Sequence, residues 1–135
     1  MTADAESRLN NSNLEWMLNR DTLAQALTTL NFRPENDLFA SRLNKQFAVY
    51  ASYKPDPQAV AVDAFTMHWA SLKFYAFPPF SVIPLVLNKI CREEAQGVVV
   101  LPEWPTQSWY PKAVQMLVQN PIYLKASKDL LRLPA

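Results

Sequence analysis

The chain has 135 residues, of which 50% are hydrophobic, and its 13 basic and 12 acidic side chains leave a formal net charge of +1. This length and composition predict one globular domain with its own core, and they exclude an intrinsically disordered chain. The lysines and arginines are scattered from Arg8 to Arg132, so the sequence does not predict a strong phosphate-binding surface.

The first part of the chain predicts one helix and two short strands. Residues 1–13 are polar and show no hydrophobic periodicity. Asp21 is expected to cap a helix, because apolar residues recur at helical spacing between residues 23 and 30. Residues 37–40 are expected to form a short buried strand, and the pattern over residues 47–53 favours a second strand.

The middle of the chain predicts a strand, a helix and a further strand. Residues 72–77 are the best strand candidate, and Ser81 is expected to cap the amphipathic helix that follows. The polar face of this helix is predicted to carry Lys89, Arg92, Glu93 and Glu94. Gly97 stands where a glycine commonly ends a helix, and the apolar run over residues 98–101 is typical of a central strand covered on both faces. This order predicts a βαβ unit with parallel strands.

The last part of the chain predicts a helix over residues 108–119 and short strands near residues 122–125 and 130–133 that complete the sheet. The inward face of this helix is expected to carry Tyr110, Ala113, Val114 and Leu117. Together these elements predict a small α/β, Rossmann-like domain of three layers with a mostly parallel sheet.

The single glycine, Gly97, contrasts with 11 prolines and excludes several kinds of site. Glycine-rich phosphate loops, dinucleotide fingerprints and the glycine-flanked nucleophile elbow all need glycine for a positive φ or for close approach to a ligand. The single cysteine, Cys91, excludes an internal disulfide and is compatible with a reducing compartment. No apolar run approaches the length of a membrane span, and no signal-peptide pattern is present. We therefore expect an intracellular protein, cytoplasmic or nuclear, that makes no membrane contact.

Candidate binding residues follow the predicted strands. Asp37 and Asp63 lie at predicted strand and loop boundaries, where α/β sheets place their ligand sites, although a turn or capping role fits them equally well. Trp104, Trp109 and Tyr110 follow the strand predicted at residues 98–101. Their rings are able to stack on nucleic-acid bases or to cover the core, and the second role is favoured.

His68 is the only histidine, and its place beside Trp69 favours a structural role over a catalytic one. A metal site would need a cluster of histidine, cysteine and carboxylate ligands at ligand spacing, and the sequence has no such cluster. No metal site is therefore predicted.

The candidate catalytic residues are Phe77, Pro78, Pro79 and Phe80. They stand between the strand predicted at residues 72–77 and the helix that follows. This order of strand, Pro-Pro-aromatic motif and helix resembles the target-base pocket of amino-group methyltransferases. In that family an Asp, Asn or Ser before the prolines accepts a hydrogen bond from the amino group being methylated. The side chain of Phe77 has no acceptor, so the pocket is degenerate.

Five ordered blocks together resemble the segment after the RNase H domain in the polyproteins of DIRS-type, tyrosine-recombinase retrotransposons. These blocks are residues 37–44, 50–57, 63–65 with Trp69, 75–80 and 104–111. Residues 3–8 are similar to the end of retroelement RNase H domains, where the residue at the position of Asp4 is the last metal-binding carboxylate. RNase H chemistry needs several carboxylates around two metal ions, so Asp4 is expected as a remnant and not as a site. We assign residues 1–13 to this remnant or to a linker.

Residues 14–135 are similar to the phage-type N6-adenine DNA methyltransferases that these elements carry. In that family the Pro-Pro-aromatic motif holds the target adenine, and an acidic strand end contacts S-adenosylmethionine. The resemblance thus implies a cofactor-binding role for Asp37 or Asp63, and a base-cradling role for the Pro78 carbonyl and the Phe80 ring. Phe77 and the lack of glycine in the cofactor loop depart from the family pattern.

We therefore expect a fragment of a retrotransposon reverse transcriptase and RNase H polyprotein, with a methyltransferase-like domain that binds no cofactor and has no activity of its own. Its expected partners are the rest of the retroelement polyprotein and, weakly, DNA. One alternative is an active S-adenosylmethionine-dependent N6-adenine DNA methyltransferase. A second is a host-recruited nucleic-acid or protein binding module whose contact residues are Trp104, Trp109 and Tyr110.

Overall fold

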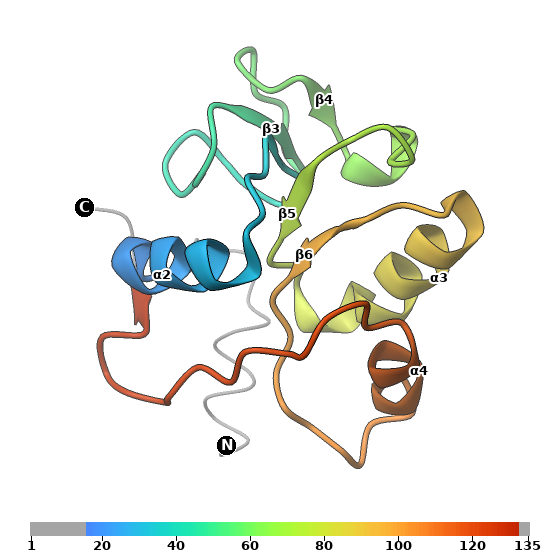
Figure 1. Ribbon diagram of the computed structural model, residues 1–135. Helices are drawn as coiled ribbons and strands as arrows, with labels where there is room; N and C mark the ends of the chain where they lie inside the picture. The colour runs from blue at the N-terminus through green and yellow to red at the C-terminus, as the bar shows by residue number, and fades with distance from the viewer. Residues whose placement is uncertain (1–15, 133–135) are drawn as a thin grey trace.

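The computed structural model describes residues 16–132, which form two sheets and three α-helices with two short 3₁₀-helices (Figure 1). The predictions for Asp4 and for residues 1–13 fall outside these residues. In chain order the elements are β1 (Met17–Leu18), α2 (Arg20–Leu30), β2 (Asn36–Asp37), β3 (Val49–Ser52), β4 (Ala61–Val62), η1 (Ala64–Thr66), β5 (Phe74–Ala76), η2 (Phe80–Val82), α3 (Ile83–Glu93), β6 (Gly97–Val99), α4 (Tyr110–Gln115) and β7 (Leu131–Arg132).

The larger sheet has five parallel strands in the order β4-β3-β2-β5-β6. The chain thus runs outward from β2 through β3 to β4, and then returns to the other side of β2 to form β5 and β6. The direction in which successive strands are added to the sheet therefore reverses between β2 and β5. The region next to the carboxyl ends of these two strands is a topological switch point. This arrangement confirms the predicted Rossmann-like α/β fold with a parallel sheet.

Helices cover both faces of this sheet, because successive residues of β5 point to opposite sides. Phe74 and Ala76 pack in one core cluster with Val86 of α3, whereas Tyr75 packs in another with Leu23 of α2. Figure 1 shows the central strands between these two helices. The predicted three layers are therefore present, and α3 and α2 are the outer ones.

The helix α2 begins earlier than the sequence predicts. Asn19 is its N-cap, and the Asn19 Oδ1 accepts hydrogen bonds from the Asp21 and Thr22 amides at 2.9 and 3.2 Å. Asp21 instead lies in the first turn, where its negative charge suits the helix dipole. The prediction that Asp21 is the cap is therefore wrong, because Asn19 stands outside the hydrophobic pattern and gives no periodic signal.

The helix α3 carries the predicted apolar face, with Ile83, Val86 and Leu87 buried. Ser81 does not cap it: Ser81 lies inside η2, and the N-cap is Val82, which makes no side-chain capping bond. The two prolines before η2 hold the chain in the extended form up to Pro79, and the tighter 3₁₀ turn then leads into α3.

The sequence predicts that Gly97 ends α3, and this is wrong. The C-cap of α3 is Glu94, which has the left-handed conformation with a φ of 53°. Gly97 opens β6 beside Phe74 of β5. A Cβ atom at Gly97 would lie 2.5 Å from the Phe74 ring, so glycine is needed here for close approach. The strand β6 pairs in parallel with β5 as predicted, but it forms an edge of the sheet in the described chain and is not central.

The C-terminal part departs most from the sequence prediction. The helix α4 is shorter than predicted, and Val114 and Leu117 are exposed because their side chains turn away from the core. No strand forms at residues 122–125. The strand β7 pairs antiparallel with β1 in a separate sheet, so it does not complete the parallel one. None of the helices formed by residues 16–132 has the length and apolarity of a membrane span.

Candidate functional site

A small pocket lies at the topological switch point, where the carboxyl ends of β2 and β5 stand side by side. Asp37 is the last residue of β2, and Phe77 follows β5 directly, so the fold brings these two predicted site residues together. The cavity volume of this switch-point pocket is about 10 Å³. The residues that line it are Trp16, Met17, Asp37, Phe39, Asn44, Gln46, Tyr75 and Phe77.

Asp37 is buried, with 2% of its surface exposed. Its Oδ2 accepts a hydrogen bond from the Gln46 amide at 2.8 Å, whereas its Oδ1 has no partner among residues 16–132. Burial raises the pKa of the Asp37 carboxyl to about 7, although the Gln46 amide, and to a smaller extent the nearby Phe39 amide, act in the opposite direction.

Two further buried polar atoms belong to residues that line the same pocket. Neither the Tyr75 hydroxyl nor the Trp16 indole Nε1 has a hydrogen-bond partner in the described part of the chain. Burial raises the pKa of the Tyr75 hydroxyl far above its usual range, and the nearby charge of Asp37 raises it further. Buried polar groups are normally hydrogen-bonded, so three unpartnered atoms around one pocket mark this region as unusual.

The loop after β2 fixes the side chains around this pocket. The Asn44 amide Nδ2 donates to the Trp16 carbonyl at 3.4 Å, and the Gln46 Nε2 donates to the Leu18 carbonyl at 2.7 Å. These bonds hold the segment before α2 against the end of β2. Trp16, Asn44 and Gln46 were not predicted as site residues, since they come from irregular segments without a recognisable motif.

The Pro-Pro-aromatic motif follows β5, as the sequence predicts, but its aromatic residues pack against the protein. Phe77 is partly buried against the cluster that contains Leu23 and Tyr75. Pro78 is fully buried, and Pro79 forms the N-cap position of η2. The Phe80 ring meets the Trp104 ring edge to face, with 4.9 Å between their centroids.

The three aromatic residues considered for base stacking gather around α3 and α4. Trp109 is buried against Ile83 and Leu87, and Trp104 and Tyr110 pack against the same cluster. None of the three lines the switch-point pocket. This placement is the core-covering arrangement that the sequence favoured.

Asp63 lies apart from Asp37, because Asp63 follows β4, Asp37 ends β2, and β3 lies between these two strands. Its side chain is exposed, and its Oδ1 accepts a hydrogen bond from the Phe65 amide at 2.9 Å. Asp63 therefore caps η1, and it does so with a φ of 73° and a ψ of 102°, a conformation that is rare outside glycine. The fold does not join the two candidate cofactor-binding carboxylates in one site.

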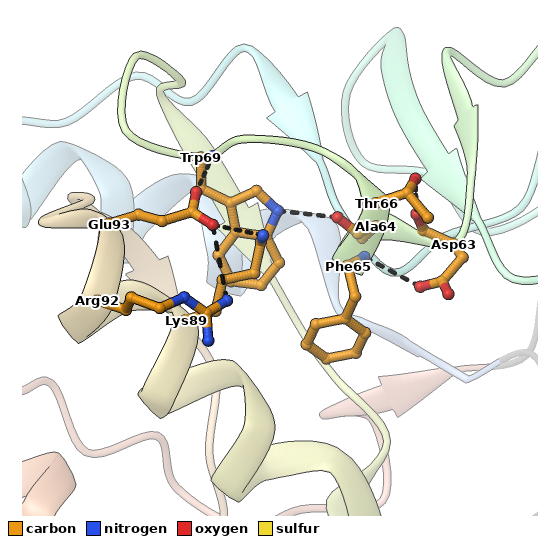
Figure 2. A network of polar contacts seen from close by, with 8 residues as sticks. All are labelled: Asp63, Ala64, Phe65, Thr66, Trp69, Lys89, Arg92 and Glu93. Atoms are coloured by element: carbon orange, nitrogen blue, oxygen red, sulfur yellow. Dashed lines mark hydrogen bonds and ion pairs between the residues drawn. The ribbon is translucent and has the colours of Figure 1, made fainter.

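Figure 2 shows a polar network that joins the loop before β5 to α3. The Lys89 Nζ lies 2.5 Å from the Glu93 Oε2, and the Glu93 Oε1 accepts the Trp69 amide at 2.6 Å. The Trp69 indole donates to the Ala64 carbonyl at 3.0 Å, and the Lys89 Nζ lies 5.3 Å from the Trp69 ring centroid. Lys89 donates to Glu93 and so lowers the pKa of that carboxyl, and the Trp69 amide adds to the effect.

The sequence prediction placed Lys89 on the polar, exposed face of α3, which is wrong, because Lys89 is only 6% exposed. Its ammonium group lies over the ring of Trp69, a residue 20 positions earlier in the chain. The spacing of Lys89 and Glu93 at i and i+4 was the one available signal of their pairing. His68 is exposed beside this network.

Residues 16–132 contain no group of three or more histidine, cysteine or acidic residues arranged to hold a metal ion. Comparison with protein-family models, with curated proteins and with solved structures found no match to this chain.

Proposed function

We propose that this chain is a fragment of a retrotransposon reverse transcriptase and RNase H polyprotein, whose methyltransferase-like domain has no catalytic activity of its own. The strand order around β2 and β5 supports the methyltransferase-like part of the proposal, because it puts a Pro-Pro-aromatic motif at the switch point of a parallel sheet. The five ordered sequence blocks support the retroelement part.

The observation that carries the claim of inactivity is the environment of Phe77. This side chain lines the switch-point pocket and supplies no hydrogen-bond acceptor for a substrate amino group. The pocket volume of about 10 Å³ is also far below the roughly 300 Å³ at which pockets for small molecules begin. Neither S-adenosylmethionine nor a flipped adenine fits such a space. We therefore propose that the chain binds no cofactor and meets DNA only weakly.

The test is incubation of the purified chain with labelled S-adenosylmethionine and adenine-containing single- and double-stranded DNA, together with calorimetry of cofactor binding. We expect no methyl transfer above background and no micromolar affinity. Loss of one positioned polar group costs roughly 3 kcal/mol in such sites, about a hundredfold in rate. Turnover by the unmodified chain would overturn the proposal.

Two variants separate the pocket assignment from the claim of inactivity. Phe77→Asn supplies the missing acceptor, and Phe77→Leu changes the size of the side chain without supplying one. If methyl transfer rose in Phe77→Asn and not in Phe77→Leu, the assignment of the pocket would be supported. If neither variant gained activity while both stayed folded, the absence of methyl transfer would have a cause other than the missing acceptor at position 77.

A specific observation favours the alternative of an active N6-adenine DNA methyltransferase. Asp37 ends the strand beside the motif and has a buried oxygen without a partner among residues 16–132, which supports a ligand-binding role for this carboxylate. The binding-module alternative has no comparable support, since Trp109 is buried and Trp104 and Tyr110 pack against the same core cluster. An intracellular location, in the cytoplasm or the nucleus, is compatible with each of these functions and with the free, exposed thiol of Cys91.

A further inference from the structure

The switch-point pocket has a hydrogen-bonding requirement that its own residues do not meet. Three residues that line it each carry a polar atom that is buried without a partner in the described chain: the Asp37 Oδ1, the Tyr75 hydroxyl and the Trp16 Nε1. Leaving one such group unpaired costs about 1–3 kcal/mol, so three together would remove a large part of the stability of a small domain. A common ligand for all three removes this cost.

The chemistry of the three atoms restricts the class of ligand. The Trp16 indole is only a donor, the Asp37 Oδ1 is an acceptor whenever the carboxyl is ionised, and the Tyr75 hydroxyl is able to act as either. A metal cation would leave the Trp16 N–H without an acceptor, and an anion would be repelled by Asp37 whenever that carboxyl is ionised. The ligand must therefore both donate and accept hydrogen bonds.

The size of the pocket restricts the ligand further. A volume of about 10 Å³ corresponds to about one water molecule, and buried waters typically make three hydrogen bonds to groups that lack other partners. A nucleoside, an amino acid or a sugar exceeds this space many times. Only a water-sized molecule meets both the volume and the mixture of donors and acceptors.

We propose that the switch-point pocket binds one internal water molecule, which accepts a hydrogen bond from the Trp16 indole, donates one to the Asp37 Oδ1 and forms a third with the Tyr75 hydroxyl. This water joins three segments: the residues before α2, the end of β2 and the middle of β5. The proposal does not depend on the retroelement origin of the chain or on its lack of activity.

The test uses the labelled full chain and measures magnetisation transfer from water to the tryptophan indole protons by NMR. Trp69 is an internal control, because it is fully buried and its indole donates to the Ala64 carbonyl at 3.0 Å. We expect a direct cross-peak between a long-lived water and the Trp16 indole proton, and none for Trp69. A protected Trp16 indole proton without a water cross-peak would overturn the proposal.

A pair of tyrosine variants tests the third partner. Tyr75→Phe removes the hydroxyl at the pocket and keeps the ring, whereas Tyr110→Phe makes the same change on α4, away from the pocket. We expect the Trp16 water cross-peak to be lost in Tyr75→Phe and kept in Tyr110→Phe. A cross-peak that persists unchanged in a folded Tyr75→Phe variant contradicts the three-partner site.

A high-resolution crystal structure of the unmodified chain gives an independent answer, since direct contacts among the three side chains would leave no place for the water.

Discussion

Asp37 and Tyr75 stand in register on the neighbouring parallel strands β2 and β5, and each has a buried oxygen without a hydrogen-bond partner among residues 16–132. Residues paired in this way point to the same face of the sheet, so the two side chains reach the same pocket. Their proximity explains why the charge of Asp37 raises the pKa of the Tyr75 hydroxyl. Two buried oxygens without partners thus lie at the point where the strand order reverses.

The raised pKa of Asp37 predicts that the protein loses stability as the pH rises. The folded state holds the proton up to about pH 7, whereas the unfolded chain releases it near 3.8, so the folded state binds more protons between these values. The free energy of unfolding should therefore fall between pH 4 and pH 7 and level off above. Urea denaturation at a series of pH values measures this trend.

The matched variant for this prediction is Asp37→Asn, which keeps the shape of the side chain and removes its titration. The variant should be close to the unmodified chain near pH 4 and more stable at pH 8, by a difference on the order of 4 kcal/mol. The lowered pKa of Glu93 acts in the opposite direction, but its contribution is lost only as the pH falls below about 4.5. A difference between the two proteins that does not change from pH 5 to pH 8 would refute the role of Asp37.

The contact between β6 and β5 predicts that Gly97→Ala destabilises the protein. The added Cβ would lie 2.5 Å from the Phe74 ring, which is fully buried and has little room to move. Overpacking of this kind costs about 1–3 kcal/mol, which chemical denaturation resolves easily. Glu94→Gly is the comparison: this residue has a φ of 53°, so glycine there should raise the stability by about 1 kcal/mol. If both variants shifted stability in the same direction, the steric explanation would be wrong.

The network around Trp69 predicts unequal effects of two neighbouring cations. Lys89→Met should lower the midpoint of denaturation, because the Glu93 carboxylate loses its closest cation and keeps the Trp69 amide. Arg92→Met should have little effect, because the Arg92 side chain is 69% exposed and its guanidinium lies 3.8 Å from Glu93. Equal losses in the two variants would mean that Lys89 acts as an ordinary surface charge.

The proposed origin of the chain predicts its genomic setting. Residues 3–8 resemble the end of an RNase H domain, so coding sequence for reverse transcriptase and RNase H should lie directly upstream, intact or frameshifted. Related copies should be dispersed through the same genome. Sequencing of the flanking DNA decides the matter: a single-copy gene with its own promoter and no such neighbour contradicts the fragment proposal.

The sequence predicted the βαβ unit because its signals are local and periodic. Phe74–Ala76 is an apolar run, and Ile83, Val86 and Leu87 recur at helical spacing, so strand, helix and strand could be placed in order. The caps were missed because Asn19 and Val82 lie outside any periodic pattern. Lys89 was misplaced because its burial depends on Trp69, and no local rule brings these two residues together.

The candidate site was predictable only in part for the same reason. Asp37 and Phe77 each follow a predicted strand, so the strand-end rule identified them. Trp16, Gln46 and the Tyr75 hydroxyl enter the pocket through loop geometry and strand register, which the sequence does not reveal. The pairing of β1 with β7 was missed as well, since strands of two residues carry almost no pattern.

That pairing has a consequence for how the domain would sit in a longer polypeptide, as the proposed origin requires. Met17 lies opposite Arg132, so the entry and the exit of the described chain are neighbours. A domain whose two ends meet can be inserted into a host sequence like a loop, without separating the segments that flank it. Neighbouring domains on its two sides would therefore be held close to each other, with this unit projecting from the point where they meet.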